Sequence, residues 1–191
     1  MPETQTVKVT VYRFEELNEK SKEKVLNEIG EWNGKAFEFD YILDNFNSDV
    51  AEKKGVKFNK IYFDSYPWSH TDGEASITDV KKLLQAVNVD LRTKAAREII
   101  ENGVIVKTRY VSHSWNPFSV DCGYSTDDNT LKQIHEIEIK IDDLLNSLAD
   151  DYVKNVRDAY EYETGEEYVK ETIAANDYRF LEDGTIWYGK I

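Results

Sequence analysis

The sequence predicts an α+β fold, a mainly antiparallel sheet with segregated helices, one of them long. Segments of strand composition lie at residues 6–12, 56–66, 104–111 and 118–124. Stretches with apolar residues at helical spacing lie between and after them, and the longest covers about eight turns in the C-terminal half. No internal repeat or low-complexity linker divides the 191 residues, so we expect one domain, 1–191, with its own core.

The N-terminal part is predicted to form one strand followed by two helices. Residues 6–12 alternate apolar and polar side chains, as in a half-buried strand. Asn18 is a favourable N-cap, and apolar residues at helical spacing then predict a helix to about Trp32. A second amphipathic helix, 39–50, should end before Gly55.

The middle of the chain is predicted to hold a central strand, a loop and two helices. Residues 56–66 carry aromatic side chains on both faces, which indicates a strand covered on both sides. Residues 66–74 are rich in turn formers and predict a loop. Helices follow at 79–87 and 91–100, and Gly103 closes the second.

A hairpin and the longest helix come next. Residues 104–111 and 118–124 have strand composition and should pair across a six-residue loop. Residues 131–160 keep apolar side chains at steps of three and four, which predicts one helix about 45 Å long.

The C-terminus is predicted to contain a short helix and a tight hairpin. Thr164 and Glu167 have the spacing of a capping box, which would start a helix running through Ala174. Asp183-Gly184 lies between two short apolar segments and indicates a two-residue type I′ turn.

Composition excludes several classes of protein. The only cysteine, Cys122, cannot form an internal disulfide and is expected to be a small buried side chain. The first thirty residues lack the apolar segment of a secretion signal, and no run approaches the roughly 18 apolar residues of a membrane span. We therefore expect a cytoplasmic protein.

Charge is the most informative property of the composition. The chain has 37 acidic and 24 basic residues, a net charge of −13. Residues 127–191 alone contain seventeen acids and seven bases, a net charge of −10. Direct binding to nucleic acid or to an anionic membrane is not expected, because phosphate contacts require a basic patch.

The acidic residues of the long helix are the first candidate for a partner-binding surface. Their spacing of seven to eight residues keeps them on related faces, so they could imitate the phosphates of a nucleic acid strand. The alternative is an ordinary solvated helix face. The predicted binding residues are Asp142, Asp143, Asp150, Asp151 and Asp158.

Aromatic residues in two predicted loops are the second candidate. Tyr66, Trp68, Trp115 and Phe118 flank the same predicted sheet. Tryptophan and tyrosine are enriched at the centres of protein interfaces. The alternative is that these rings cover the ends of the core.

The motif search predicts no catalytic residue, no metal and no cofactor. The sequence contains no nucleophile elbow, phosphate-binding glycine loop or zinc-protease motif. His70, Asp72, Glu74 and His113 could meet at strand ends and hold a divalent metal, but their spacing is unspecific. A triad of Ser69, His70 and Asp72 is disfavoured because the residues lie too close together in one segment.

Three blocks of the sequence resemble a widespread group of small bacteriophage and prophage proteins of uncharacterised role, sometimes labelled antitoxin-like. They are residues 12–24 (YRFEELNEKSKEK), 61–75 (IYFDSYPWSHTDGEA) and 160–184, which ends in NDYRFLEDG. The order of the blocks is the same. The sequence departs from the pattern at Pro67, His70 and Thr71, which weakens any catalytic or metal role for His70.

The resemblance implies a phage accessory protein made in the cytoplasm of an infected bacterium. We expect a non-enzymatic inhibitor of the anti-CRISPR type, whose acidic face blocks the basic nucleic-acid-binding surface of a host defence protein such as a CRISPR effector. One alternative is an antitoxin that masks the basic site of a toxin. Another is a metal-dependent nuclease or nucleotide hydrolase that uses His70, Asp72 and His113. The identity of the target, the host and the oligomeric state stay open.

Overall fold

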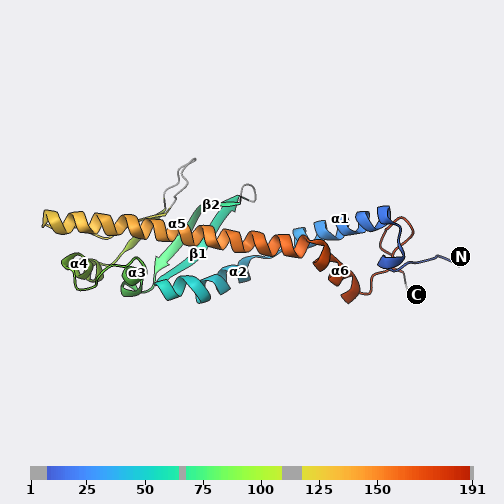
Figure 1. Ribbon diagram of the computed structural model, residues 1–191, viewed down its shortest axis with the longest axis horizontal. Helices are drawn as coiled ribbons and strands as arrows, with labels where there is room; N and C mark the ends of the chain where they lie inside the picture. The colour runs from blue at the N-terminus through green and yellow to red at the C-terminus, as the bar shows by residue number, and fades with distance from the viewer. Residues whose placement is uncertain (1–7, 65–67, 109–117, 190–191) are drawn as a thin grey trace, which may run out of the picture. The chain divides into compact units, whose positions relative to one another are not determined.

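The computed structural model describes residues 8–64, 68–108 and 118–189 (Figure 1). Contacts divide the chain into two compact units: a terminal unit, residues 1–37 and 158–191, and a central unit, residues 38–157. Helices and antiparallel strands in separate segments confirm the predicted α+β class. The predicted extent of a single domain, 1–191, stays a prediction.

The central unit contains both strand pairs and most of the long helix α5. Its elements in chain order are α2 (Asp40–Phe46), the π-helical turn η2 (Asn47–Ala51), the 3-10 turn η3 (Glu52–Lys54), β1 (Val56–Asp64), β2 (Ser69–Ile77), α3 (Val80–Ala86), α4 (Lys94–Asn102), β3 (Ile105–Thr108), β4 (Phe118–Asp121) and residues 128–157 of α5 (Asp128–Thr164). Asp79 and Thr93 cap α3 and α4 through their side chains, which confirms both predicted helices. The long helix is confirmed as well.

Two antiparallel pairs make up the sheet structure of the described residues. Strand β1 pairs with β2, and Phe63 lies opposite His70 in their register. Strand β3 pairs with β4, which confirms the predicted pairing. Thr108 lies opposite Phe118, and the predicted six-residue loop lies outside the described residues. Two predictions were wrong. Among the described residues β1 has one ladder partner rather than a central position, and most of the predicted loop 66–74 belongs to β2.

The core of the central unit is built by α5 against the strands and α2–α4. The fully buried residues Phe58, Phe118 and Tyr152 are its largest side chains. The ring centroids of Phe58 and Phe118 lie 5.6 Å apart in an edge-to-face arrangement. Most of the apolar positions that predicted α5 are buried here, namely Ile134, Ile137, Ile141, Leu148, Tyr152 and Val156.

The terminal unit packs helices from the two ends of the chain. It contains the 3-10 turn η1 (Phe14–Glu16), α1 (Glu19–Ala36), the end of α5 and α6 (Glu166–Ala175). Asn18 caps α1 as predicted, because its side chain accepts the Ser21 N–H at 3.0 Å. The buried core consists of Phe14, Leu17, Val25, Ile29, Val169, Ile173, Phe180 and Ile186.

Two local predictions for the terminal unit were wrong. Residues 8–11 form no strand, and Tyr12 makes only an isolated bridge with Phe180. The Thr164 hydroxyl donates to the Tyr160 carbonyl inside α5 at 2.7 Å, so it makes no capping box, and Gly165 is the N-cap of α6.

The predicted C-terminal hairpin turn exists with a different geometry. The Leu181 N–H donates to the Thr185 carbonyl at 2.8 Å, and the Gly184 N–H donates to the Leu181 carbonyl at 2.9 Å. Gly184 has φ +83°, whereas Asp183 is not among the residues with positive φ. The loop therefore has three residues with glycine in the left-handed position, because a type I′ turn would need positive φ at both residues.

None of the helices among the described residues has the length and apolar character needed to cross a membrane. This finding agrees with the absence of a long apolar run in the sequence.

Candidate functional site

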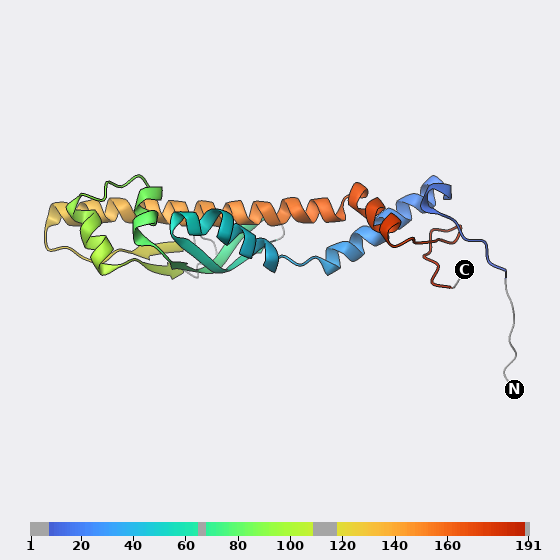
Figure 2. The same cartoon turned by 90° about the horizontal axis from the view of Figure 1, so that it is seen from below.

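A row of polar side chains on α5 faces strand β4 in the central unit. Glu138, Asp142 and Asn146 accept hydrogen bonds from the N–H groups of residues 122, 120 and 118 at 2.9, 2.7 and 3.2 Å. Figures 1 and 2 both show α5 running alongside the strands of this unit. The acceptors on the helix and the donors on the strand have similar spacing, because four residues of an α-helix advance about 6 Å and two residues of a strand advance about 6.8 Å.

This row closes the edge of β4 that does not face β3. An open strand edge presents unpaired N–H and C=O groups, and here side chains of α5 take the place of a neighbouring strand. Asn146 makes the most hydrogen bonds of the three, because its amide also donates to the Phe118 carbonyl at 3.0 Å and to the Asp142 carbonyl at 2.7 Å. Asn47 bridges the N–H and C=O of Phe58 in the same way, at 2.9 and 2.8 Å.

The row continues to a buried histidine on β2. The His70 side chain is 1% exposed. Its Nδ1 lies 2.7 Å from Oδ1 of Asp150, and its Nε2 lies 3.2 Å from Oδ1 of Asn146. The ring stacks on Phe118 with a centroid distance of 6.0 Å. His70 therefore ties β2 to α5, and its carboxylate partner reaches the surface with 63% of its side chain exposed.

The acidic residues of the predicted row thus differ in burial and in their contacts. Asp142 is half-buried and holds β4, so its assignment to a solvent-facing row is corrected. Asp143, Asp150 and Asp151 are exposed on the central unit. Asp158 is exposed and belongs to the terminal unit. Sequence periodicity alone could not separate the half-buried acid from the exposed ones, because it does not show which strand lies beside the helix.

The exposed face of α5 in the central unit is not uniformly acidic. Its first part interleaves both signs of charge, with Lys132, Glu136 and Lys140 exposed. From Asp143 to Asp151, the only exposed charged residues are acids. The acidic part of this face is therefore residues 143–151, which includes Asp150 in contact with His70, and the exposed Lys154 follows it.

The predicted aromatic patch is only partly at the surface. Phe118 is 1% exposed and lies in the core, which corrects its assignment to a binding surface. Trp68 is half-buried and stacks on Phe63, with ring centroids 6.1 Å apart and planes at 21°. Tyr66 and Trp115 lie outside the described residues.

The half-buried aromatic residues are linked to one of the exposed acids, Asp150, through His70. Phe63 is opposite His70 in the β1–β2 register and contacts Tyr152 of α5, with ring centroids 6.4 Å apart. His70 in turn contacts Asp150. The two candidate surfaces, which the sequence presented as alternatives, are therefore connected at Asp150. We call Asp143, Asp150, Asp151, Phe63 and Trp68 the acidic–aromatic surface.

The alternative metal and catalytic residues do not form a site in the described part of the chain. Both ring nitrogens of His70 are occupied, and Asp72 accepts the N–H of Gly73 at 2.7 Å. His113 lies outside the described residues. Among the residues that are described, no group of three or more His, Cys, Asp or Glu side chains could hold a metal ion.

Cys122 does not have the environment of a nucleophile. Its side chain is fully buried directly after the end of β4. Burial is the main cause that raises the pKa of the thiol to about 12, and the nearby carboxylates of Glu138, Asp121 and Asp142 contribute to this increase. The thiolate form is therefore scarce at neutral pH, as the sequence reading expected for a structural cysteine.

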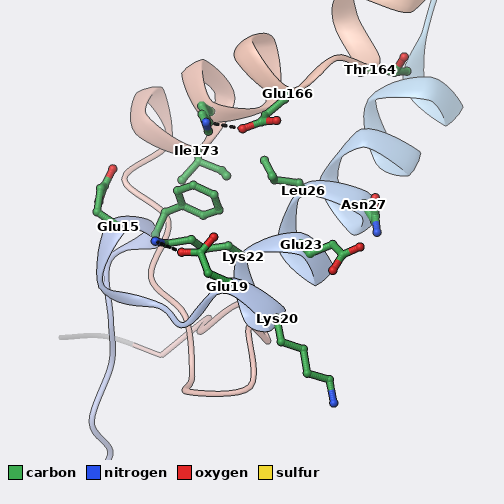
Figure 3. Close-up of a pocket in the computed structure, with 12 residues that line it drawn as sticks. Glu15, Glu19, Lys20, Lys22, Glu23, Leu26, Asn27, Thr164, Glu166 and Ile173 are labelled. Atoms are coloured by element: carbon green, nitrogen blue, oxygen red, sulfur yellow. Dashed lines mark hydrogen bonds and ion pairs between the residues drawn. The ribbon is translucent and has the colours of Figure 1, made fainter.

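A pocket of about 1000 Å³ lies wholly within the terminal unit (Figure 3). Phe14, Leu26 and Ile173 supply its apolar lining. Its charged residues are of both signs, and two ion pairs, Lys22 with Glu19 and Lys170 with Glu166, neutralise much of its rim. This balance gives no preference for an anionic or a cationic ligand.

Comparison of this chain with protein-family models, with curated proteins and with solved structures finds no match. The resemblance to small phage and prophage proteins stays a prediction.

Proposed function

We propose that the protein is a non-enzymatic binding protein whose acidic–aromatic surface occupies a basic groove of a bacterial host protein. The observation that supports this most is the His70–Asp150 contact at 2.7 Å. It ties an exposed carboxylate to the residue that lies opposite Phe63 in the β1–β2 register, and Phe63 stacks on Trp68.

The chemistry of this surface suits a partner rich in arginine. Carboxylates attract a basic groove over long distances and speed encounter. A guanidinium group can pair with a carboxylate and stack on an aromatic ring at the same time. Half-buried aromatic rings also supply apolar contact area with little loss of side-chain entropy. Trp68 and Phe63 are placed to provide that area.

The partner class follows from charge and from the resemblance to phage proteins. A net charge of −13 suits a competitor of nucleic acid at a basic protein surface. We propose a host defence protein in the bacterial cytoplasm, with a CRISPR effector as the first candidate and a toxin as the second. Either partner would be blocked by occupancy, without a chemical step.

The enzymatic alternative has no supporting observation among the described residues. A metal-dependent nuclease or nucleotide hydrolase needs carboxylates or histidines that converge on an ion. His70 instead uses both ring nitrogens within the fold. We therefore do not favour it.

The proposal is tested by affinity capture with a matched pair of charge-reversal variants. Asp143→Lys/Asp151→Lys changes two exposed acids of the proposed surface. Glu101→Lys/Glu136→Lys makes the same change in charge at two exposed positions of the central unit outside it. Each tagged protein is incubated with lysates of bacteria that carry CRISPR and toxin–antitoxin systems.

We expect the wild-type protein and the Glu101/Glu136 variant to retain the same host protein, and the Asp143/Asp151 variant to lose it. Raising the salt concentration should release that protein, because exposed charges are screened within about 8 Å at physiological ionic strength. If both variants retain it equally, the proposed surface is wrong. If no host protein is retained in stoichiometric amount, the binding function itself is contradicted.

A further inference from the structure

Three aromatic side chains of the central unit, Phe39, Phe63 and Trp68, form a row that we call the aromatic row. The ring of Phe63 lies in the middle. Its centroid is 5.5 Å from that of Phe39, with the planes at 72°, and 6.1 Å from that of Trp68, with the planes at 21°. Phe39 comes directly before α2, Phe63 belongs to β1, and Trp68 comes directly before β2. Three separate segments of the chain therefore bring their rings together.

The rings of the aromatic row keep part of their surface in contact with solvent. Phe39 is 41% exposed, and Phe63 and Trp68 are half-buried. A ring that stays exposed forgoes part of the free energy that its burial would supply. A connected group of such rings is typical of a surface that binds a partner.

The backbone at Trp68 supplies an independent observation. Its φ angle is +59°, in the left-handed region that glycine adopts readily and bulky side chains rarely adopt. Backbone strain of this kind is concentrated at functional sites, where a particular side chain is needed in spite of its cost. The strained backbone therefore indicates that the indole ring has a role in binding.

Exposed carboxylates accompany the ring of Phe39. Glu38 and Asp40 flank it in the chain, and both are exposed. Among the described residues, neither of the two has an ion-pair partner. Burial is the main cause that raises the pKa of Tyr152 to about 12, and the nearby carboxylate of Asp40 contributes to this increase. Because the Tyr152 ring contacts Phe63 at 6.4 Å, Asp40 lies on the side of α2 that faces the aromatic row.

We infer that the aromatic row is a binding site for an arginine side chain of the partner, whose guanidinium group stacks on an exposed ring and pairs with the carboxylate of Glu38 or Asp40. The inference rests on the proposed function, because the arginine belongs to the basic groove of that partner. Arginine fits better than lysine, since a guanidinium group is planar and weakly hydrated, whereas an ammonium group is compact and strongly hydrated.

The test is a titration of the full ¹⁵N-labelled chain with N-acetyl-arginine amide and, separately, with N-acetyl-lysine amide. The two compounds carry the same charge, so a difference between them reports on stacking. We expect the arginine compound to shift the amide signals of Phe39, Phe63 and Trp68, with a Kd about threefold lower than that of the lysine compound. Equal Kd values, or shifts spread evenly over the exposed acids, would overturn the inference.

Matched variants separate the ring from the charges. Phe39→Ala should remove most of the preference for arginine, whereas Tyr124→Ala, at a residue of the central unit that is 72% exposed, should leave it unchanged. Glu38→Gln/Asp40→Asn should weaken both compounds alike, and Glu101→Gln/Glu136→Gln should weaken them less. A preference for arginine that survives Phe39→Ala, or equal effects of the two double variants, would contradict the site.

Two substitutions separate the ring of Trp68 from its backbone. Trp68→Gly and Trp68→Ala both remove the indole ring, so both should lose most of the preference for arginine. Glycine accepts a φ of +59° without strain, so Trp68→Gly should have a higher urea midpoint than Trp68→Ala. A lower midpoint for the glycine variant, or an unchanged preference for arginine in both variants, would contradict the role given to Trp68.

These measurements need no partner protein, so the two proposals can fail independently. A preference for arginine at the aromatic row together with no captured host protein would leave the arginine site standing and refute the proposed function. A captured host protein together with equal binding of the two compounds would do the reverse.

Discussion

Replacing Asp142 and its neighbour Asp143 by alanine should give clearly different losses of stability. Asp142 accepts the Val120 N–H at 2.7 Å, and Val120 is only 9% exposed. Asp142→Ala leaves that donor without its acceptor next to a buried strand. Hydrogen bonds to charged groups contribute about 1.5–3 kcal/mol, and water entering at the half-buried position would offset part of this. We expect a loss of about 1–3 kcal/mol.

Asp143→Ala should change stability by no more than about 0.5 kcal/mol, because Asp143 is exposed and alanine is the better helix former. Asp142→Asn keeps an oxygen acceptor and should recover most of the loss. Urea unfolding is followed by the ring proton signals of His70, which report on the central unit. Equal losses for Asp142→Ala and Asp143→Ala would refute the division of the acidic residues into two kinds.

Three further outcomes are expected. Gly73→Ala should destabilise the central unit by about 1–3 kcal/mol, since a Cβ there would lie 2.8 Å from Cζ of Phe118; an unchanged urea midpoint would contradict this packing. Cys122 should react with a thiol reagent at pH 8 only as fast as the protein unfolds, because burial raises its pKa to about 12; rapid labelling of the folded protein would contradict it. The pKa of Asp127 is lowered, first because the Thr130 N–H donates to its carboxylate. Its contribution to stability is therefore present above the ordinary pKa near 4 and lost as the pH falls through the folded value, so Asp127→Asn should flatten the acid side of the stability profile; an unchanged profile would argue against this cap of α5.

The elements that the sequence predicted well are those with a strong local signal. The apolar steps of residues 131–160 gave α5 almost completely, because burial of one helix face requires that period. The cap at Asn18 predicted the start of α1 through a local hydrogen bond. Such signals depend on a few neighbouring residues, so they can be recognised without knowledge of the tertiary structure.

Strand β2 was missed because its composition is that of a loop. Residues 69–77 contain few apolar side chains, and Gly73 lowers strand propensity. Contacts within the central unit explain why these residue types occur in β2. Glycine at 73 leaves room for the Phe118 ring, and His70 is buried because α5 supplies its hydrogen-bond partners. Neither contact can be read from local sequence.

The candidate surface was located in part. Sequence reasoning found Asp150, Asp151 and Trp68, but it assigned Asp142 and Phe118 to the surface and missed Phe63. Asn146, an amide in the middle of a helix interior, was the signal that could have revealed the inner row, because a buried polar residue must find partners. Which partners it finds depends on the strand beside it.

Site-specific photocrosslinking from α5 tests the central claim most directly, because it reports where the partner lies. Ser147 is exposed between Asp143 and Asp151 on α5, so Ser147→benzoylphenylalanine adds a crosslinker and keeps both acids. Gln133→benzoylphenylalanine places the same group on an exposed position of α5 outside the proposed surface. After irradiation in bacteria that carry the defence system, we predict a crosslink to one host protein from position 147 and none from position 133. Crosslinks from position 133 alone, or equal crosslinks from both, would contradict the acidic–aromatic surface as the binding site.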